Sequence, residues 1–160
     1  MKDKVIRNQL IGSLKGERAH ISFDQAIAEF PFDLAGQQVI NLEHTAWQLV
    51  YHLWFCQWDI LDFMINPEYK YHEFPSGYWP KQPGPASEKI WQQTINNFRQ
   101  DQRTVISMIK DPEIELSDTL PYDRKKTYFR EYLILIDHNS YHIGQLVDIR
   151  MLLGVPVRGY

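Results

Sequence analysis

The pattern of hydrophobic and polar positions has the period of an α-helix in three long segments of the chain. They cover residues 45–65, 86–110 and 126–153. Each segment ends at residues that stop a helix, because proline cannot continue one and glycine readily takes the left-handed conformation at a helix C-terminus. These stop signals are Asn66-Pro67, Asp111-Pro112 and Gly154 followed by Pro156. The three segments are therefore predicted to be long helices.

Two shorter segments are also predicted to be helical. Residues 3–15 have a weaker helical pattern, and residues 23–30 follow Ser22, a favourable N-cap, and stop at Pro31. No segment alternates hydrophobic and polar residues over the length of a strand, and the sequence has no internal repeat. A chain of 160 residues has the size of one compact domain. The sequence therefore predicts an all-α fold in a single domain spanning residues 1–160.

The connection between the first two long helices is unusually long. Residues 67–85 form 19 residues with five prolines, whereas antiparallel neighbouring helices need only about 2 to 8 residues between them. A connection of this length can cross from one end of a bundle to the other. It predicts a four-helix bundle with one long crossover connection, in which the helices at 45–65 and 86–110 run parallel.

Composition and charge exclude several kinds of partner and location. The net charge is -3, from 17 Lys and Arg against 20 Asp and Glu, so the basic excess that nucleic acids or anionic membranes require is absent. The charged N-terminus resembles no secretory signal, and the most apolar stretch is too short to span a bilayer. With Cys56 as the single cysteine, the chain has no internal disulfide. We expect a cytoplasmic protein that binds neither nucleic acid nor membrane, and any metal ion must be held by His and carboxylate groups.

Of the six histidines, only His138 and His142 stand four residues apart, which places both rings on one face of a helix. That face also carries apolar residues together with Glu131 and Gln145, so it is predicted to point inward. Inward-facing imidazoles need partners for their ring nitrogens. Either the two rings share a cation, or they are core histidines that bond to Glu131, Gln145 or water.

The helix at 45–65 is apolar around nearly its whole circumference and has one polar stripe. The stripe consists of Thr45, Gln48, His52, Asp59 and Asp62. It is either the solvated face of the helix or the lining of a polar cleft. In the second interpretation His52 is a third metal ligand, and Gln48 and Asp59 support the ligands or contact a substrate. His44 would replace His52 if the helix were rotated, and Cys56 is expected to be a small buried apolar residue.

Familiar catalytic motifs are absent from the sequence. The run from His138 to His142 lacks the Glu that follows the first His in zincin peptidases, and a lone Glu17-x-x-His20 does not make a di-iron site. There is neither a glycine-rich phosphate loop nor a Gly-x-Ser-x-Gly elbow. No catalytic residue is assigned.

Short motifs spread along the predicted helices nevertheless resemble those of a known family. WQLVYHL at 47–53, HNSYHIGQ at 138–145 and LGVP at 153–156 resemble the DinB/YfiT-like superfamily in order, spacing and position on the helices. AHISFDQA at 19–26 and QWDIL at 57–61 are similar to a largely uncharacterised subgroup of it. The resemblance extends over nearly the whole chain.

The resemblance implies a bundle whose second and fourth helices supply three histidines to one divalent metal ion, zinc or nickel. Carried over by position, the ligands are His52, His138 and His142. Family members include S-transferases that use low-molecular-weight thiols and metal-dependent hydrolase-like proteins, and many are homodimers. We therefore expect a homodimeric, metal-dependent enzyme acting on a small molecule, as an S-transferase or a hydrolase. The alternative is a non-catalytic binding or stress-related bundle whose metal is structural or absent.

The aromatic residues of the long connection are expected to anchor it to the bundle, with contact to a substrate as the alternative. We expect residues 68–83 to pack over the open end of the bundle. In that position they would affect substrate choice more than metal affinity.

Overall fold

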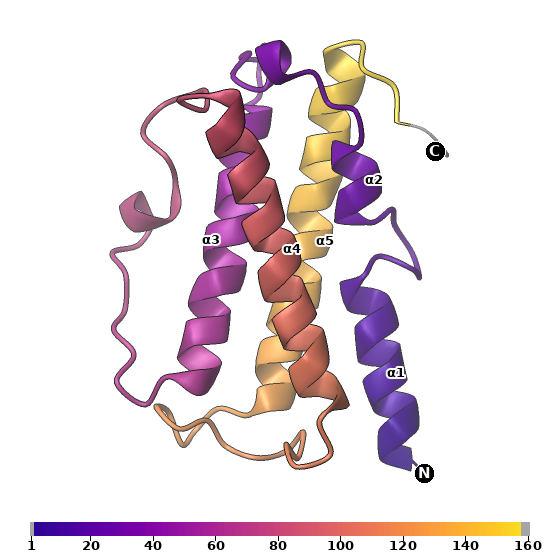
Figure 1. Cartoon of the computed structure of the whole chain (residues 1–160), viewed down its shortest axis with the longest axis vertical. Coiled ribbons are helices and arrows are strands. Elements are labelled where there is room, and N and C mark those ends of the chain that lie inside the picture. The colour runs from indigo at the N-terminus through magenta and orange to yellow at the C-terminus, as the bar shows by residue number, and fades with distance from the viewer. Residues whose placement is uncertain (1, 158–160) are drawn as a thin grey trace.

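The structure is a computed structural model that describes residues 2–157, and Figure 1 shows its four long helices side by side. These are α1 (Lys2–Leu14), α3 (Ala46–Ile65), α4 (Glu88–Lys110) and α5 (Tyr128–Leu152). A short helix, α2 (Phe23–Ile27), and two 3-10 turns, η1 (Phe32–Leu34) and η2 (Ser76–Tyr78), lie in the connections. Over the described residues, β-pairing is limited to one isolated bridge between Thr119 and Thr127. The predicted all-α fold is confirmed.

Capping residues explain where the helices begin. At α3 the Thr45 hydroxyl accepts a hydrogen bond from the Gln48 amide at 3.2 Å, and the Gln48 side chain accepts one from the Thr45 amide at 3.0 Å. Ser22 caps α2 with a similar reciprocal pair. Ser87 and Thr127 cap α4 and α5, which therefore begin two residues later than the hydrophobic pattern predicts.

The connection from 66 to 87 returns the chain to the end at which α3 begins. As a result α3 and α4 run parallel, and α5 runs in the opposite direction between them and α2 (Figure 1). The connection passes along the outer side of α3 instead of over an open end of the helices. Its last part is fastened at the start of α3, where the Thr45 hydroxyl donates to the Pro83 carbonyl at 2.6 Å.

Two apolar clusters fill the interior, one toward each end of the helices. The first contains residues from the N-terminal half of α3 and the C-terminal half of α5. The second contains residues from the C-terminal half of α3, the N-terminal half of α5 and part of α1. Between them lie the buried amides of Gln57 and Asn139. Gln57 donates to the Phe98 carbonyl at 2.7 Å, and Asn139 donates to the Gln57 side-chain oxygen at 3.2 Å. A polar layer therefore separates the two apolar clusters.

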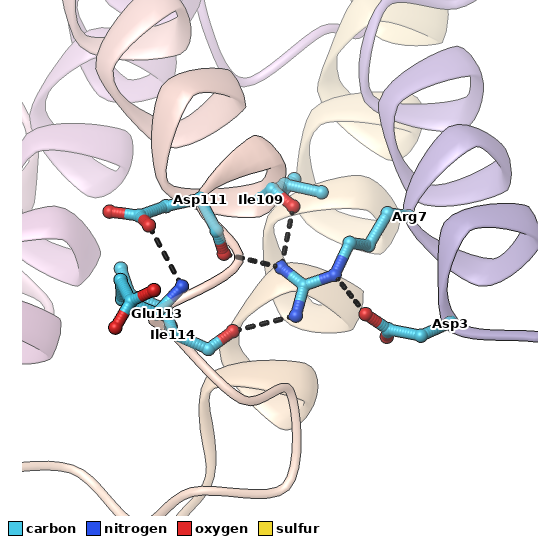
Figure 2. A network of polar contacts seen from close by, with 6 residues as sticks. All are labelled: Asp3, Arg7, Ile109, Asp111, Glu113 and Ile114. Atoms are coloured by element: carbon cyan, nitrogen blue, oxygen red, sulfur yellow. Dashed lines mark hydrogen bonds and ion pairs between the residues drawn. The ribbon is translucent and has the colours of Figure 1, made fainter. Parts of the chain in front are cut away.

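A buried side chain of α1, Arg7, binds the end of α4 and the residues that follow it. Its guanidinium donates to the carbonyl oxygens of Ile109, Asp111 and Ile114 at 2.8, 2.9 and 2.7 Å, and it pairs with Asp3 at 2.6 Å (Figure 2). Carbonyl groups at a helix C-terminus have no N–H donor within the helix, so they need outside donors. Arg7 supplies these donors and holds α1 against α4.

Candidate metal centre

Three histidines converge between α3 and α5. His52 comes from α3, and His138 and His142 come from successive turns of α5. One ring nitrogen from each residue lies within 4.8 Å of the other two, and the Nε2 atoms of His52 and His138 are 3.1 Å apart. The structure thus brings together the three predicted ligands. In the part of the chain that the structure describes, no Cys, Asp or Glu joins this cluster.

The helical spacing of His138 and His142 places their ring centroids 4.5 Å apart. His52 reaches both rings across the contact between α3 and α5, at centroid distances of 5.0 and 4.6 Å. His52 is only 6% exposed, and Thr45 and Asp59, which belong to the same polar stripe of α3, are buried as well. The interpretation of this stripe as a solvated face is therefore wrong, because the long connection covers it.

Hydrogen bonds on the outer side fix two of the rings. His52 Nδ1 lies 3.1 Å from the Tyr78 carbonyl, and because a carbonyl can only accept, this nitrogen carries the proton. His142 Nδ1 lies 2.7 Å from the side-chain oxygen of Gln145 and donates to it. In both residues the lone pair is left on Nε2. This arrangement, with one ring nitrogen held by a protein acceptor and the other free, is typical of metal-binding histidines.

All three rings are neutral at ordinary pH. Burial lowers the pKa of His52 from 6.5 to about 3 and that of His138 to about 4, and it lowers the pKa of His142 as well. His138 Nδ1 is buried and has no hydrogen-bond partner among the described residues. Because His52 Nε2 keeps its lone pair, His138 Nε2 donates to it across the 3.1 Å contact when no ion is bound. Neutral imidazoles gathered in this way are suited to bind a shared cation once that proton is displaced.

Trp79 forms one wall of the site. Its indole ring stacks on His52 at a centroid distance of 3.7 Å and on His44 at 3.8 Å, so it lies between these two imidazoles. His44 is therefore separated from the cluster by Trp79 and does not replace His52 as a ligand. The contacts of Tyr78 and Trp79 with His52 place the long connection against a predicted ligand. The relative effect of this segment on substrate choice and on metal affinity stays a prediction.

Asp59 lies behind the site and anchors the long connection. Its carboxylate accepts hydrogen bonds from the hydroxyls of Tyr69 at 2.7 Å and Tyr78 at 2.9 Å, and His72 Nε2 is 3.6 Å away. Burial raises the pKa of Tyr78 to about 12 and also raises the pKa of Tyr69, so both hydroxyls keep their protons and donate. Asp59 is therefore linked to His52 through Tyr78, whose hydroxyl donates to Asp59 and whose carbonyl accepts from His52.

The other predicted site residues have different positions. Gln145 contacts His142, as described above. Gln48 uses its side-chain oxygen to cap α3, and Glu131 is buried and paired with Arg130. Among the described residues, no hydrogen bond or ion pair joins the side chain of Gln48 or Glu131 to the three histidines. The capping role of Gln48 could be predicted from the sequence, because Thr45 and Gln48 have the spacing of a capping box.

Cys56 lies beside the cluster without belonging to it. Its sulfur is 3.5 Å from Nδ1 and 3.6 Å from Nε2 of His52, and the residue is buried. Burial raises the pKa of the Cys56 thiol to about 12, so the group is a neutral thiol here. This agrees with the prediction of a small buried apolar residue.

Comparison of the chain with protein-family models, with curated proteins and with solved structures found no match. Among the helices of residues 2–157, none combines the length and the apolar composition needed to cross a bilayer.

Proposed function

We propose that His52, His138 and His142 bind one divalent metal ion, zinc or nickel, and that the protein is a metal-dependent enzyme acting on a small molecule. The observation that carries this proposal is the convergence of three neutral imidazoles whose outer nitrogens are held by Tyr78 and Gln145 or left unpaired. The proposal also assigns the helical arrangement to the DinB/YfiT-like four-helix bundle with one long crossover.

The distances within the cluster suit such an ion. Nitrogen ligands lie about 2.0 to 2.1 Å from zinc in a tetrahedral site, which separates two of them by roughly 3.4 Å. The Nε2 atoms of His52 and His138 are 3.1 Å apart, so only a small displacement is needed for both to bind one ion. The ligand nitrogen of His142 lies within 4.8 Å of the other two, which also supports a shared ion.

An open coordination position favours an enzyme over a structural site. Structural zinc sites are usually closed by four protein ligands, whereas catalytic sites keep one position for water or substrate. The cluster supplies three ligands, and the nearby Cys56 stays outside it. A divalent ion held by three neutral imidazoles keeps its full positive charge and lowers the pKa of a water or thiol beside it, which provides a nucleophile near neutral pH.

The choice between thiol transfer and hydrolysis rests on the family resemblance, which places S-transfer first. The same resemblance carries the proposal of a homodimer, whereas the single cysteine supports the proposal of a cytoplasmic location. The net charge of -3 supports a small-molecule substrate over nucleic acid. A non-catalytic bundle with a structural metal is the competing proposal.

The test is metal analysis of protein purified without a polyhistidine tag from cells grown with added zinc or nickel. We expect about one ion per chain and loss of that ion in a variant that replaces all three histidines by alanine. Absorption spectra of the cobalt-loaded protein then test the open position, because a small anion such as azide should alter the visible bands. Absence of metal in the native chain would overturn the proposal, and cobalt bands insensitive to added anions would favour the structural site.

A further inference from the structure

A buried chain of hydrogen bonds between α3, α4 and α5 ends beside His138. Gln57 and Asn139 form it, and these residues are only 0% and 2% exposed. The chain begins at the Phe98 carbonyl, which lies 2.7 Å from Gln57 Nε2, and it continues from Gln57 Oε1 to Asn139 Nδ2 at 3.2 Å. The two amides therefore connect the backbone of α4 to the residue that follows a proposed metal ligand.

The Phe98 carbonyl sets the orientation of both amides. A carbonyl can only accept, so Gln57 turns its NH2 group toward it and its side-chain oxygen toward Asn139. That oxygen also only accepts, so Asn139 turns its own NH2 group toward Gln57. The remaining atom, Asn139 Oδ1, is buried and has no hydrogen-bond partner among the described residues. A buried acceptor without a donor costs free energy.

A second buried atom without a partner belongs to the adjacent residue, His138. It is Nδ1 of the imidazole, which none of the residues 2–157 reaches with a hydrogen bond. Burial lowers the pKa of His138, and the Asn139 side chain lies close enough to the ring to oppose part of that shift. A proton on Nδ1 would let the ring donate to Asn139 Oδ1 and would satisfy both atoms.

The tautomer of His138 decides whether this bond forms. In the 3.1 Å contact between the Nε2 atoms of His52 and His138, the proton lies on His138, because His52 carries its proton on Nδ1. His138 Nδ1 and Asn139 Oδ1 are then both acceptors and cannot bond to each other. When a metal ion binds His138 Nε2, one proton leaves Nε2 and one binds Nδ1, so the ring stays neutral. The new Nδ1 proton is the donor that Asn139 Oδ1 lacks.

We propose that Asn139 is a positioning residue of the metal site, which accepts the Nδ1 proton of metal-bound His138 and fixes the orientation and tautomer of that ring. The inference rests on the proposed function, because the proton moves to Nδ1 only when an ion binds Nε2. It gives the third histidine the kind of outer support that the other two have. It also gives the polar layer a purpose, since Gln57 holds the Asn139 amide in the orientation that His138 needs.

Nuclear magnetic resonance of the full chain labelled with 15N-histidine tests the tautomer. Two-bond correlations between ring protons and ring nitrogens distinguish the two neutral forms, and zinc is the probe because it is diamagnetic. We expect His138 to carry its proton on Nε2 before zinc is added and on Nδ1 afterwards, with slow exchange of the Nδ1 proton with water. A zinc-loaded chain in which His138 keeps its proton on Nε2 would overturn the inference.

Two variants test the acceptor itself. Asn139→Leu removes it, and Gln57→Leu is the matched control, because it removes a buried amide from the same layer and leaves Asn139 Oδ1 in place. We expect zinc affinity to fall roughly 10- to 100-fold in Asn139→Leu and by less than about threefold in Gln57→Leu, measured by competition with a chromophoric chelator. Urea unfolding without zinc compares the stability that each variant loses. A purely structural role of the layer predicts that affinity falls equally in both.

The outcomes separate this inference from the proposed function. If zinc binds and the two variants lose affinity equally, the positioning role is wrong while the metal site stands. If Asn139→Leu does not fold, the tautomer and the proton exchange of His138 in the native chain decide the question. Failure of the native chain to bind zinc would overturn the proposed function and this inference together.

Discussion

His138 and His142 share one helix, so the distance between their rings is insensitive to small shifts in packing. His52 comes from α3 and depends both on the contact between helices and on Tyr78 and Trp79 of the long connection. Each ring would nevertheless contribute one of the three proposed ligands. Loss of any one would leave a two-histidine site with more water around the ion.

Single alanine substitutions should distinguish the metal-binding histidines from the other histidines. His52→Ala, His138→Ala and His142→Ala are expected to fold and to lose metal, with affinity at least ~100-fold lower, because even loss of a hydrogen bond to a ligand costs roughly 10- to 100-fold. Metal content is measured after dialysis against a fixed free-metal concentration. His20→Ala, His44→Ala and His72→Ala serve as controls that keep full occupancy. Full occupancy in His52→Ala with loss in His44→Ala would contradict the assignment.

Metal-free protein should lose stability as the pH falls below 6.5. Burial lowers the pKa of His52 to about 3 and of His138 to about 4, so below 6.5 the unfolded chain binds protons that the folded chain excludes. The contribution of these two rings to the free energy of unfolding is therefore fully present above pH 6.5 and decreases as the pH falls toward 4. Each of the two rings accounts for roughly 2 kcal/mol at pH 5, so we expect a total loss of roughly 4 kcal/mol, measured by urea unfolding after chelation.

The matched variant for this titration is His52→Gln, which removes one of the buried imidazoles. Its stability should change less steeply between pH 6.5 and 5. Identical pH profiles for the native chain and the variant would show that the rings are not the source of the effect.

At the scale of elements, the long connection between α3 and α4 holds the site together. Tyr78 uses its carbonyl to fix His52 and its hydroxyl to contact Asp59, so one residue joins the anchor to the ligand. A change at Asp59 therefore reaches His52 through the backbone of Tyr78. This makes the connection part of the proposed metal site.

Asp59→Asn should weaken metal binding without unfolding the helices. An amide is a poorer acceptor for two hydroxyls than a carboxylate, so the segment around Tyr78 becomes less firmly held. We expect metal affinity to fall by up to ~10-fold, less than for loss of a ligand, because the substitution acts one step further from the ion. Competition with a chromophoric chelator measures this affinity, and circular dichroism checks the helices.

Asp62→Asn is the matched control, because Asp62 lies on the same helix and its carboxylate bonds to Asn66 near the helix end. Its metal affinity should equal that of the native chain. Equal affinities for Asp59→Asn and Asp62→Asn would refute the role of the anchor.

The long helices could be predicted from sequence because apolar periodicity, caps and stop signals agree at each of them. The pair His138 and His142 was predictable for the same reason, since helical spacing alone fixes its geometry. The support of His52 could not be predicted. It comes from the backbone carbonyl of Tyr78, which has no sequence signature, and from the stacking of Trp79, whose position depends on the path of a long connection.

At the scale of the whole molecule, the three histidines lie on helices that two apolar clusters hold together on either side. The clusters do not depend on an ion for their packing. The metal ion would therefore join parts that are already assembled, unlike the ion of a zinc finger, which is required for folding.

Removal of the metal should lower the melting temperature and leave the helices intact. A ligand present at about 100 times its dissociation constant stabilises the fold by about 2.7 kcal/mol, which corresponds to roughly 5 to 10 °C for a chain of this size. Thermal unfolding with and without a chelator measures the shift. Loss of helical circular dichroism on chelation at 25 °C would contradict this prediction.

The position of Trp79 gives the chain an optical label for its own site. The excited indole ring lies in contact with two imidazoles, His44 and His52, and imidazoles quench indole emission more strongly when they carry a proton. The brightness of Trp79 therefore depends on the state of the ring that Tyr78 holds. The chain has four other tryptophans, so the difference in emission between the native chain and Trp79→Phe isolates this signal and follows the site in real time without an added dye.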